Sequence, residues 1–354
     1  MLEAQAHDHV PAAGEPFAGG TTAQHEHALA ECLRVPGAME GRSEVEALAA
    51  NPSVRKAAIA PDWQVMLGEA RRLGRVRTVA RNAHAIHKSW GSYGALRGGE
   101  DVGLVINGGI DLRMFYRAWS HAYVVEAASG DTVRLSLQIF DDAGDAVQKV
   151  FPETAEGESA LREWAGRFGI SAGAPAVRPA AAGAPERPDA SIDVKALLDA
   201  WQDLKDVHHF RAMIARHGAG RTQALRLAQG RFTEPAARDA LARALTGAHA
   251  GAVPVMVFVA NRGIVQIHSG TVGTAERRDG WLHLTDPDFH LHVREAGIAQ
   301  SWIVTKPTSD GPVTALECYD TRGEAVLQMF GVRQEGSAEN PAWQALAHGL
   351  ARAS

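Results

Sequence analysis

The sequence predicts an α+β fold that is built twice along the chain. Three observations lead to this prediction: the two halves share a spaced set of residues, each half has helical segments at its ends, and each half has consecutive β-branched runs joined by short turns. Consecutive strands with short connections pair antiparallel. We therefore expect a tandem structural duplication in which each half forms a large antiparallel β-sheet with helices at its ends, and the halves pack pseudo-symmetrically.

The duplication becomes visible when the chain is shifted over itself by 179 residues, which places Asn82 on Asn261. Further matches in the same register are Gly91 with Gly270, Leu112 with Leu291, Asp141 with Asp320, Gly144 with Gly323, Phe151 with Phe330 and Trp164 with Trp343. Chance does not hold one register over about eighty residues, so the two halves are repeats that share a fold.

The strands are expected where apolar and β-branched residues run together. The first such run in each half is VRTVARNAHAIHKSWG or VPVMVFVANRGIVQIHSG. Later runs, SLQIFDDAGDAVQKVF and ALECYDTRGEAVLQMF, are each two strands around a turn with the pattern Asp-x-x-Gly. A short helix that holds Trp164 or Trp343 closes each half.

Changes in composition along the sequence divide the 354 residues into four parts. We expect a disordered tail at 1–24, an N-terminal repeat at 25–170, an Ala/Pro-rich linker at 171–192 and a C-terminal repeat at 193–354. No apolar run is long enough for membrane insertion, and a net charge of -5 argues against general nucleic-acid binding. Cys32 and Cys318 have no metal-ligand spacing, so a disulfide framework is not expected and the cytoplasm is the natural compartment.

The segment 206–227, DVHHFRAMIARHGAGRTQALRL, predicts a helical hairpin with two adjacent histidines. Phe210 and Ile214 fall on the inward stripe, and His208 lies beside it, where an imidazole can reach a neighbouring cleft. His209 lies about 100° further round the helix. The shift of 179 residues places His208 on Leu29, so the fold does not require this histidine. The same hairpin also resembles a helix-turn-helix, and a DNA-binding regulator is therefore the alternative function.

Other polar residues are candidates for the same site. Arg113 and Phe115 alternate along one strand and therefore share a face, as Gln328 and Phe330 do on the last strand. Arg221 and Lys306 are cations of the kind that carboxylates seek. His87 is an auxiliary ligand candidate. His290 and His292 share a strand face, but a zinc site there lacks a third ligand at a fixed spacing.

Several segments, taken in order, resemble one family. These are NAHAIHKSWGSYG, IDLRMF, DVHHF followed by GRTQALR, FVANRGIVQIHSG, QSWIVTKPTSDG and MFGVRQEG. The chain, over roughly residues 40 to 350, resembles the cytoplasmic haem-binding and hemin-degrading proteins of bacterial haem uptake, the HemS/ChuS/PhuS type.

The resemblance implies haem, iron protoporphyrin IX, as the ligand, and roles for individual residues. His208 matches the axial ligand of the haem iron, with His209 beside it as the alternate ligand. Arg113 matches the distal, catalytic arginine and Phe115 its aromatic neighbour over the macrocycle. Arg221, Lys306 and Gln328 match polar groups near the haem propionates, and Phe330 stands where the family often has tyrosine.

The implied function is to receive imported haem and either deliver it or take part in its degradation for iron acquisition. The implied partners are an inner-membrane haem transporter upstream and a haem oxygenase or reductase downstream. An outside reductase is expected because the sequence has no flavin or nicotinamide motif. The protein is expected to be a monomer or a dimer.

Overall fold

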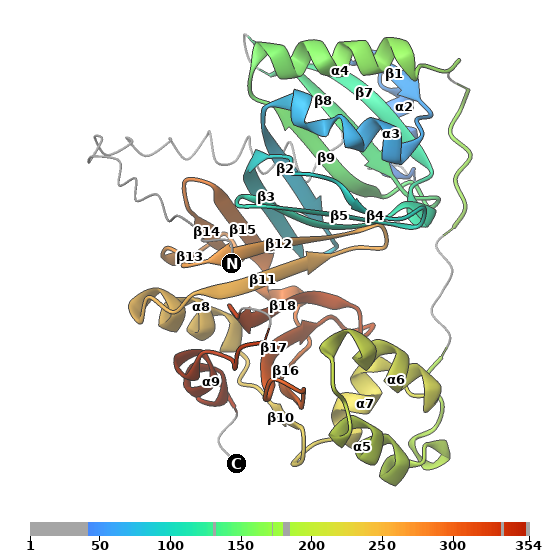
Figure 1. Cartoon of the computed structure of the whole chain (residues 1–354). Coiled ribbons are helices and arrows are strands. Elements are labelled where there is room, and N and C mark those ends of the chain that lie inside the picture. Colours follow the sequence, from blue (N-terminus) through green and yellow to red (C-terminus); the bar gives the residue numbers. More distant parts are fainter. Residues whose placement is uncertain (1–41, 130–131, 172, 180–184, 334–335, 352–354) are drawn as a thin grey trace, which may run out of the picture. The chain divides into compact units, whose positions relative to one another are not determined.

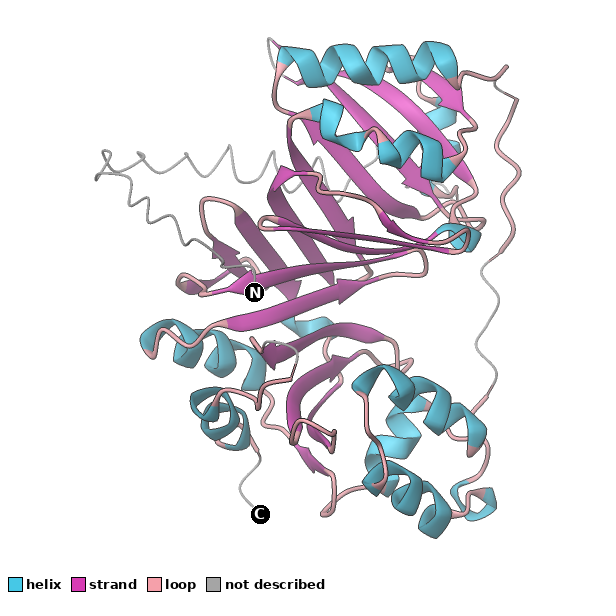
Figure 2. Cartoon of the chain, in the orientation of Figure 1, coloured by secondary structure: helices cyan, strands magenta, loops and turns pink. Residues whose placement is uncertain are grey.

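The computed structural model describes residues 42–129, 132–171, 173–179, 185–333 and 336–351. All of these residues belong to one compact unit. They form two antiparallel sheets of nine strands each, with helices packed on them (Figures 1 and 2). The predicted α+β class and its antiparallel sheets are therefore confirmed. Every helix in these ranges is too short or too polar to span a lipid bilayer. The predicted tail, 1–24, lies outside the described residues.

The first sheet has the strand order β1-β7-β8-β9-β2-β3-β15-β14-β13. Its strands are β1 (Arg55–Ile59), β7 (His121–Ser129), β8 (Thr132–Phe140), β9 (Ala146–Pro152), β2 (Arg75–Arg81), β3 (Ala85–Ser92), β15 (Phe289–Arg294), β14 (Trp281–Thr285) and β13 (Ala275–Arg278).

The second sheet repeats this order as β10-β16-β17-β18-β11-β12-β6-β5-β4. Its strands are β10 (Thr233–Pro235), β16 (Gln300–Lys306), β17 (Val313–Tyr319), β18 (Ala325–Gly331), β11 (Val255–Ala260), β12 (Ile264–Gly270), β6 (Ile110–Phe115), β5 (Val102–Asn107) and β4 (Arg97–Gly98).

The two halves exchange three strands each, which the sequence did not predict. Strands β4 to β6 come from the first half but extend the second sheet, because β6 pairs with β12. Strands β13 to β15 come from the second half and extend the first sheet through the pairing of β15 with β3. The exchange carries Arg113 out of its own half and into the sheet that holds Lys306, Gln328 and Phe330.

Two asparagines that match under the repeat hold the exchanged halves together. The Asn82 side chain donates to the carbonyls of Ala260 at 3.1 Å and Val326 at 2.9 Å. Asn261 does the same in reverse, donating to Arg81 at 3.0 Å and Val147 at 2.9 Å. Each asparagine thus satisfies backbone groups of the other half, so the repeat preserves a joint between the halves.

The helices cover the sheets at their ends (Figure 1). They are α2 (Glu44–Ala50), α3 (Trp63–Gly68), α4 (Ala155–Arg167), α5 (Val194–Gln202), α6 (Phe210–Arg216), α7 (Arg221–Leu227), α8 (Ala240–Ala250) and α9 (Pro341–His348). The described residues also include short 3-10 turns between the helices or strands: η1 (Ala70–Leu73), η2 (Tyr116–Ala118), η3 (Asp189–Ser191), η4 (Val207–His209) and η5 (Glu295–Gly297).

Helices α5, α6 and α7 pack on one end of the second sheet. Trp201 of α5 is fully buried, stacks on Phe232 at 5.2 Å and meets Phe210 edge-on at 4.4 Å. Trp302 and Tyr319 from the sheet belong to the same apolar cluster. This aromatic packing fixes the start of α6, and with it the position of the adjacent histidines.

Candidate functional site

One face of the second sheet is only partly covered. Residues in direct register project to the same face, and Glu317, Gln328, Phe258, Ile267 and Asp111 form such a row across five strands. We call the side that carries this row the site face. The strand β11 alternates along its length, with Val255, Val257 and Val259 buried on the opposite face and Met256, Phe258 and Ala260 half-buried on the site face.

Apolar side chains remain exposed where the site face crosses β5 and β6. Phe115 is 37% exposed, Ile106 55% and Val102 42%. All three lie on the site face, because Val102 pairs with Phe115 and Ile106 with Asp111. Phe330, half-buried on β18, meets Phe258 edge-on with ring centroids 5.0 Å apart. The site face therefore offers a broad apolar surface.

Arg113 lies on the site face between Val265 and Leu104. It is half-buried and forms an ion pair with Asp111, two residues earlier on the same strand. Burial raises the pKa of Asp111 above its ordinary value, and the charge of Arg113 opposes that rise. The guanidinium has five N–H donors, so the pair with Asp111 leaves donors for a further acceptor.

Arg221 and Lys306 meet one buried carboxylate, Glu317. The Arg221 Nη2 atom lies 2.6 Å from Glu317 Oε1, and the Lys306 Nζ atom lies 2.7 Å from the same oxygen. Arg221 Nε also donates to Tyr319 Oη at 3.1 Å, and Tyr319 donates to Glu317. We call these four residues the ion cluster. With two cations and one carboxylate it carries a net positive charge.

In the ion cluster, burial and neighbouring opposite charges shift the pKa values of Glu317 and Lys306 in opposite directions. Burial alone raises the pKa of Glu317, but the neighbouring charges of Arg221 and Lys306 outweigh it and hold that pKa well below its ordinary value. Burial lowers the pKa of Lys306, and Glu317 opposes the shift. Arg221 keeps 27% of its side chain exposed, whereas Lys306 keeps 4%. Arg221 is therefore the cation of this cluster that solvent and ligands can reach.

Glu317 was missed by the sequence reasoning. It follows three apolar or small residues in the buried strand VTALECY, and its strongest partner, Arg221, is 96 residues away. The repeat held a signal: under the shift of 179 residues, Glu317 corresponds to Gln138, Lys306 to Ala127 and Tyr319 to Phe140. The ion cluster is thus an asymmetry of the second half.

The two adjacent histidines lie in the 3-10 turn η4, just before α6 begins at Phe210. The sequence predicted both within a helix. Asp206 changes this local structure, because its side chain accepts from the backbone N–H of His208 and caps the turn. The side chain of His208 is 86% exposed, and His209 is exposed as well.

A chain of aromatic contacts connects these histidines to the site face. Phe210, which follows His209, is buried with its ring 4.5 Å from the Arg221 guanidinium and 4.9 Å from the Lys306 ammonium. Lys306 lies 5.3 Å from the ring of Phe330, which is on the site face. Gln328 stands in register between Glu317 and Phe258. The structure therefore brings the histidine turn, both cations, Gln328 and Phe330 to one region.

His87 lies elsewhere, in β3 of the first sheet. It is fully buried, with Nε2 3.0 Å from Ser89 Oγ and its ring 4.8 Å from Phe289. Burial holds the pKa of His87 well below its ordinary value. A side chain enclosed in this way is a core histidine, and it does not join the exposed residues of the site face.

His290 and His292, which were considered for zinc, contact different neighbours. His292 Nδ1 lies 2.8 Å from His283 Nδ1, and His290 packs on Trp90 at 4.5 Å. Among the residues that the structure describes, no group of three or more His, Cys, Asp or Glu could hold a metal ion.

The hairpin of α6 and α7 turns its second helix inward. Thr222, Gln223, Ala224 and Leu225 are buried, and Gln223 donates to the carbonyl of Arg187 at 2.6 Å. Arg226 at the end of α7 pairs with Asp189 at 2.8 Å. A recognition helix presents side chains to the DNA groove, whereas the middle of α7 is buried in the protein.

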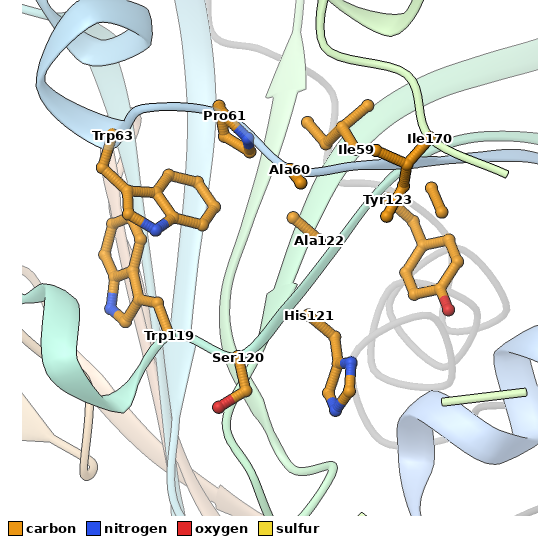
Figure 3. Close-up of a pocket in the computed structure, with 11 residues that line it drawn as sticks. Ile59, Ala60, Pro61, Trp63, Trp119, Ser120, His121, Ala122, Tyr123 and Ile170 are labelled. Carbon is orange, nitrogen blue, oxygen red and sulfur yellow. The ribbon is translucent and has the colours of Figure 1, made fainter. Parts of the chain in front are cut away.

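A separate pocket of about 210 Å³ lies in the first half (Figure 3). Trp63, Trp119, His121 and Tyr123 surround Ala122 there, and the two tryptophans meet edge-on at 4.7 Å. None of the predicted site residues lines it. This pocket is therefore separate from the predicted site residues.

Comparison with known proteins identifies relatives over most of the chain. The hemin transport protein HmuS of Yersinia pestis is 31% identical over 80% of this chain and 82% of its own length. The hemin transport protein HemS of Yersinia enterocolitica is 30% identical over 86% of this chain and 88% of its own length.

Two solved structures are similar throughout. Holo-PhuS, a heme-binding protein from Pseudomonas aeruginosa, superposes with a TM-score of 0.85 at 36% identity, covering 92% of this chain and 96% of PhuS. ChuS, an E. coli heme oxygenase, superposes with a TM-score of 0.79 at 30% identity, covering 88% of this chain and 94% of ChuS.

The family model of the haemin-degrading HemS/ChuX domain matches residues 41–168 and 218–350. The two matches correspond to the two repeats. Arg113 and Phe115 fall in the first match, and Arg221, Lys306, Gln328 and Phe330 in the second, whereas His208 and His209 fall between them. This chain belongs to the haemin-degrading HemS/ChuX family and carries its domain twice.

Proposed function

We propose that this protein binds haem on the site face, where His208 would ligate the iron and His209 would be the alternate ligand. The observation that carries the proposal is the contact chain through Phe210, which sets an exposed histidine turn beside a net positive ion cluster and a half-exposed aromatic surface. Haem is a flat apolar ring with two carboxylates and a metal at its centre, and these features match that surface in kind.

The residues have distinct parts in this proposal. Phe115, Phe330 and the neighbouring apolar side chains would exclude water from the ring. Arg221, the exposed cation of the ion cluster, would contact a propionate, and Lys306 would add charge from behind it. Gln328 adds an amide at the same edge.

Arg113 has a different role because it lies further along the site face, on β6. Its guanidinium would supply a positively charged hydrogen-bond donor to an anion bound together with haem, as electrostatic stabilisers do in other sites. Bound haem supplies the redox chemistry, and the protein supplies ligation, orientation and the donor at Arg113.

In the cell, we propose that the protein acts in the cytoplasm between an inner-membrane haem transporter and a haem oxygenase or reductase. The hemin transport names of HmuS and HemS support the trafficking role, and the heme oxygenase name of ChuS supports a role in degradation. Degradation consumes electrons, which an external donor must supply. Delivery and participation in degradation are both compatible with one exposed protein ligand, since a single bond must be broken to release haem.

Titration of the full-length protein with hemin tests the proposal. A Soret band that saturates at a fixed stoichiometry is expected, and Phe330→Asp, which places a charge on the site face, should weaken binding. Val133→Asp, at a side chain that is 57% exposed on β8 of the other sheet, is the matched control. Equal binding by the two variants and the wild type would overturn the location of the site. Loss of the Soret band with a reductant in the presence of catalase would assign degradation as well as delivery.

A further inference from the structure

His208 and His209 are both exposed, but only one of them is held in place. Asp206 Oδ1 lies 2.7 Å from His208 Nδ1 and also accepts the backbone N–H of His208 at 2.8 Å. For the His209 ring, no hydrogen bond to another described residue is found, and its backbone N–H donates to the carbonyl of Asp206 at 3.1 Å. The two histidines therefore differ in that only the ring of His208 contacts the carboxylate of Asp206.

The contact with Asp206 sets which ring nitrogen of His208 is available. A carboxylate only accepts hydrogen bonds, so Nδ1 of His208 carries the hydrogen. In the neutral ring the lone pair is then on Nε2, the outer nitrogen of a side chain that is 86% exposed. Because so little packing restrains this side chain, the hydrogen bond to Asp206 fixes both its orientation and its tautomer.

We propose that Asp206 is a positioning residue that makes His208, rather than His209, the ligand of the haem iron and increases its strength as a donor. This inference rests on the proposed haem-binding function and deepens it. Histidines that ligate metals commonly donate their second N–H to a carboxylate, which orients the ring and raises its basicity. A more basic axial ligand stabilises ferric over ferrous iron and lowers the reduction potential of bound haem.

The same carboxylate also caps the turn η4, so a purely structural role has to be separated from positioning. Asp206→Asn keeps an acceptor for the backbone and for the ring but removes the charge. Asp206→Ala removes the cap, the ring contact and the charge together. Asp193→Asn makes the same chemical change at the cap of α5, where the side chain accepts from Ala196 N–H at 3.0 Å, and serves as the matched control.

The experiment uses hemin complexes of the full-length wild type and of these three variants. It measures the midpoint potential of the bound haem, the rate of hemin loss to an excess of an apo-globin acceptor, and the melting temperature. Asp206→Asn is expected to raise the potential with a spectrum like the wild type. Asp206→Ala is expected to raise it further and to lose hemin about 10- to 100-fold faster, the range for removal of a partner of a metal ligand. Asp193→Asn should change neither the midpoint potential nor the rate of hemin loss.

The choice between histidines gives a second measurement. His209→Ala should leave hemin loss unchanged in the wild-type background but accelerate it in Asp206→Ala, because the unsupported ring of His208 then competes with His209. The role of Asp206 is overturned if its variants lower only the melting temperature and keep the potential and the hemin-loss rate of the wild type, provided His208→Ala alters the wild-type spectrum. If wild-type hemin binding is insensitive to both histidines, the proposed ligation is itself wrong and the role of Asp206 falls with it.

Discussion

Arg221 closes a buried ion pair with Glu317 across 96 residues of sequence, with Nη2 2.6 Å from Oε1 and 2.7 Å from Oε2. The Lys306 ammonium lies 2.7 Å from the same carboxylate, so Glu317 holds both cations that were expected at the propionates. The edge that we propose for the propionates is therefore an ion cluster whose net positive charge remains after internal pairing.

Removal of the central carboxylate should strongly destabilise the fold. Glu317→Gln removes the counter-charge of the buried Lys306 and of the partly exposed Arg221. Removal of one partner from a buried ion pair typically costs about 3–5 kcal/mol. Urea unfolding at pH 7 measures the loss in the free energy of unfolding. Glu324→Gln, an exposed residue beyond the same strand, is the control and should change it by less than about 0.5 kcal/mol. A similar small change for both variants would show that the ion cluster is not a unit of stability.

Arg113 should matter for small anions bound to the haem complex rather than for the fold. A hydrogen bond from a charged donor contributes about 1.5–3 kcal/mol, so Arg113→Met is expected to weaken fluoride binding by the ferric complex about 10-fold or more. Spectrophotometric fluoride titration measures this change. Arg117→Met, at an arginine that is 82% exposed and paired with Asp101, should bind fluoride as the wild type does. Equal fluoride affinity in all three proteins would remove Arg113 from the site.

The buried His87 should make the fold sensitive to acid. Burial is the largest cause that holds its folded-state pKa below that of the unfolded chain, so the unfolded state binds a proton that the folded state does not. Stability is therefore complete above about pH 6.5 and falls as pH drops below that value toward the folded pKa, by about 1.4 kcal/mol per pH unit.

His87→Gln, which copies Gln266 at the matching position of the repeat, should reduce this slope by about one proton. Urea unfolding between pH 7.5 and 5.5 measures the slope. His348→Gln, at an exposed position, is the control and should keep the wild-type slope. An undiminished slope in His87→Gln would assign the acid sensitivity to other groups.

The repeat could be predicted from sequence because some of its matching residues make specific hydrogen bonds to backbone groups. Asn82 and Asn261 each donate across to the other half, and each also accepts from its own turn, at 2.9 Å from Ala85 N–H for Asn82 and at 3.1 Å from Ile264 N–H for Asn261. Few other side chains supply a donor and an acceptor at this spacing, so the matching positions remain recognisable.

The exchange of strands could not be predicted, because the repeat provides two equivalent partner strands, one in each half. Strand β6 pairs with β12, but β3 is the equivalent strand of its own half and has the same place in the first sheet. Local sequence patterns of two equivalent partners are alike, so alternation alone does not distinguish pairing within a half from pairing between halves. The position of Arg113 in the second sheet depends on that choice.

The sequence best predicted the positions of candidate residues that lie close together on one strand. Arg113 with Phe115, and Gln328 with Phe330, share the site face as strand alternation requires. The histidines were expected on a helix, but the cap at Asp206 starts a 3-10 turn and delays α6 to Phe210. Glu317 was missed because its role is defined by partners in distant segments.

The most direct measurement compares hemin titrations of the wild type, His208→Ala and His209→Ala by absorption spectroscopy. We predict a Soret band in the wild type that is retained in His209→Ala and is shifted, with weaker binding, in His208→Ala. Hemin in about thousandfold excess over Kd should also stabilise the wild type by about 4 kcal/mol. A Soret spectrum and affinity that are the same in all three proteins would contradict ligation by this turn.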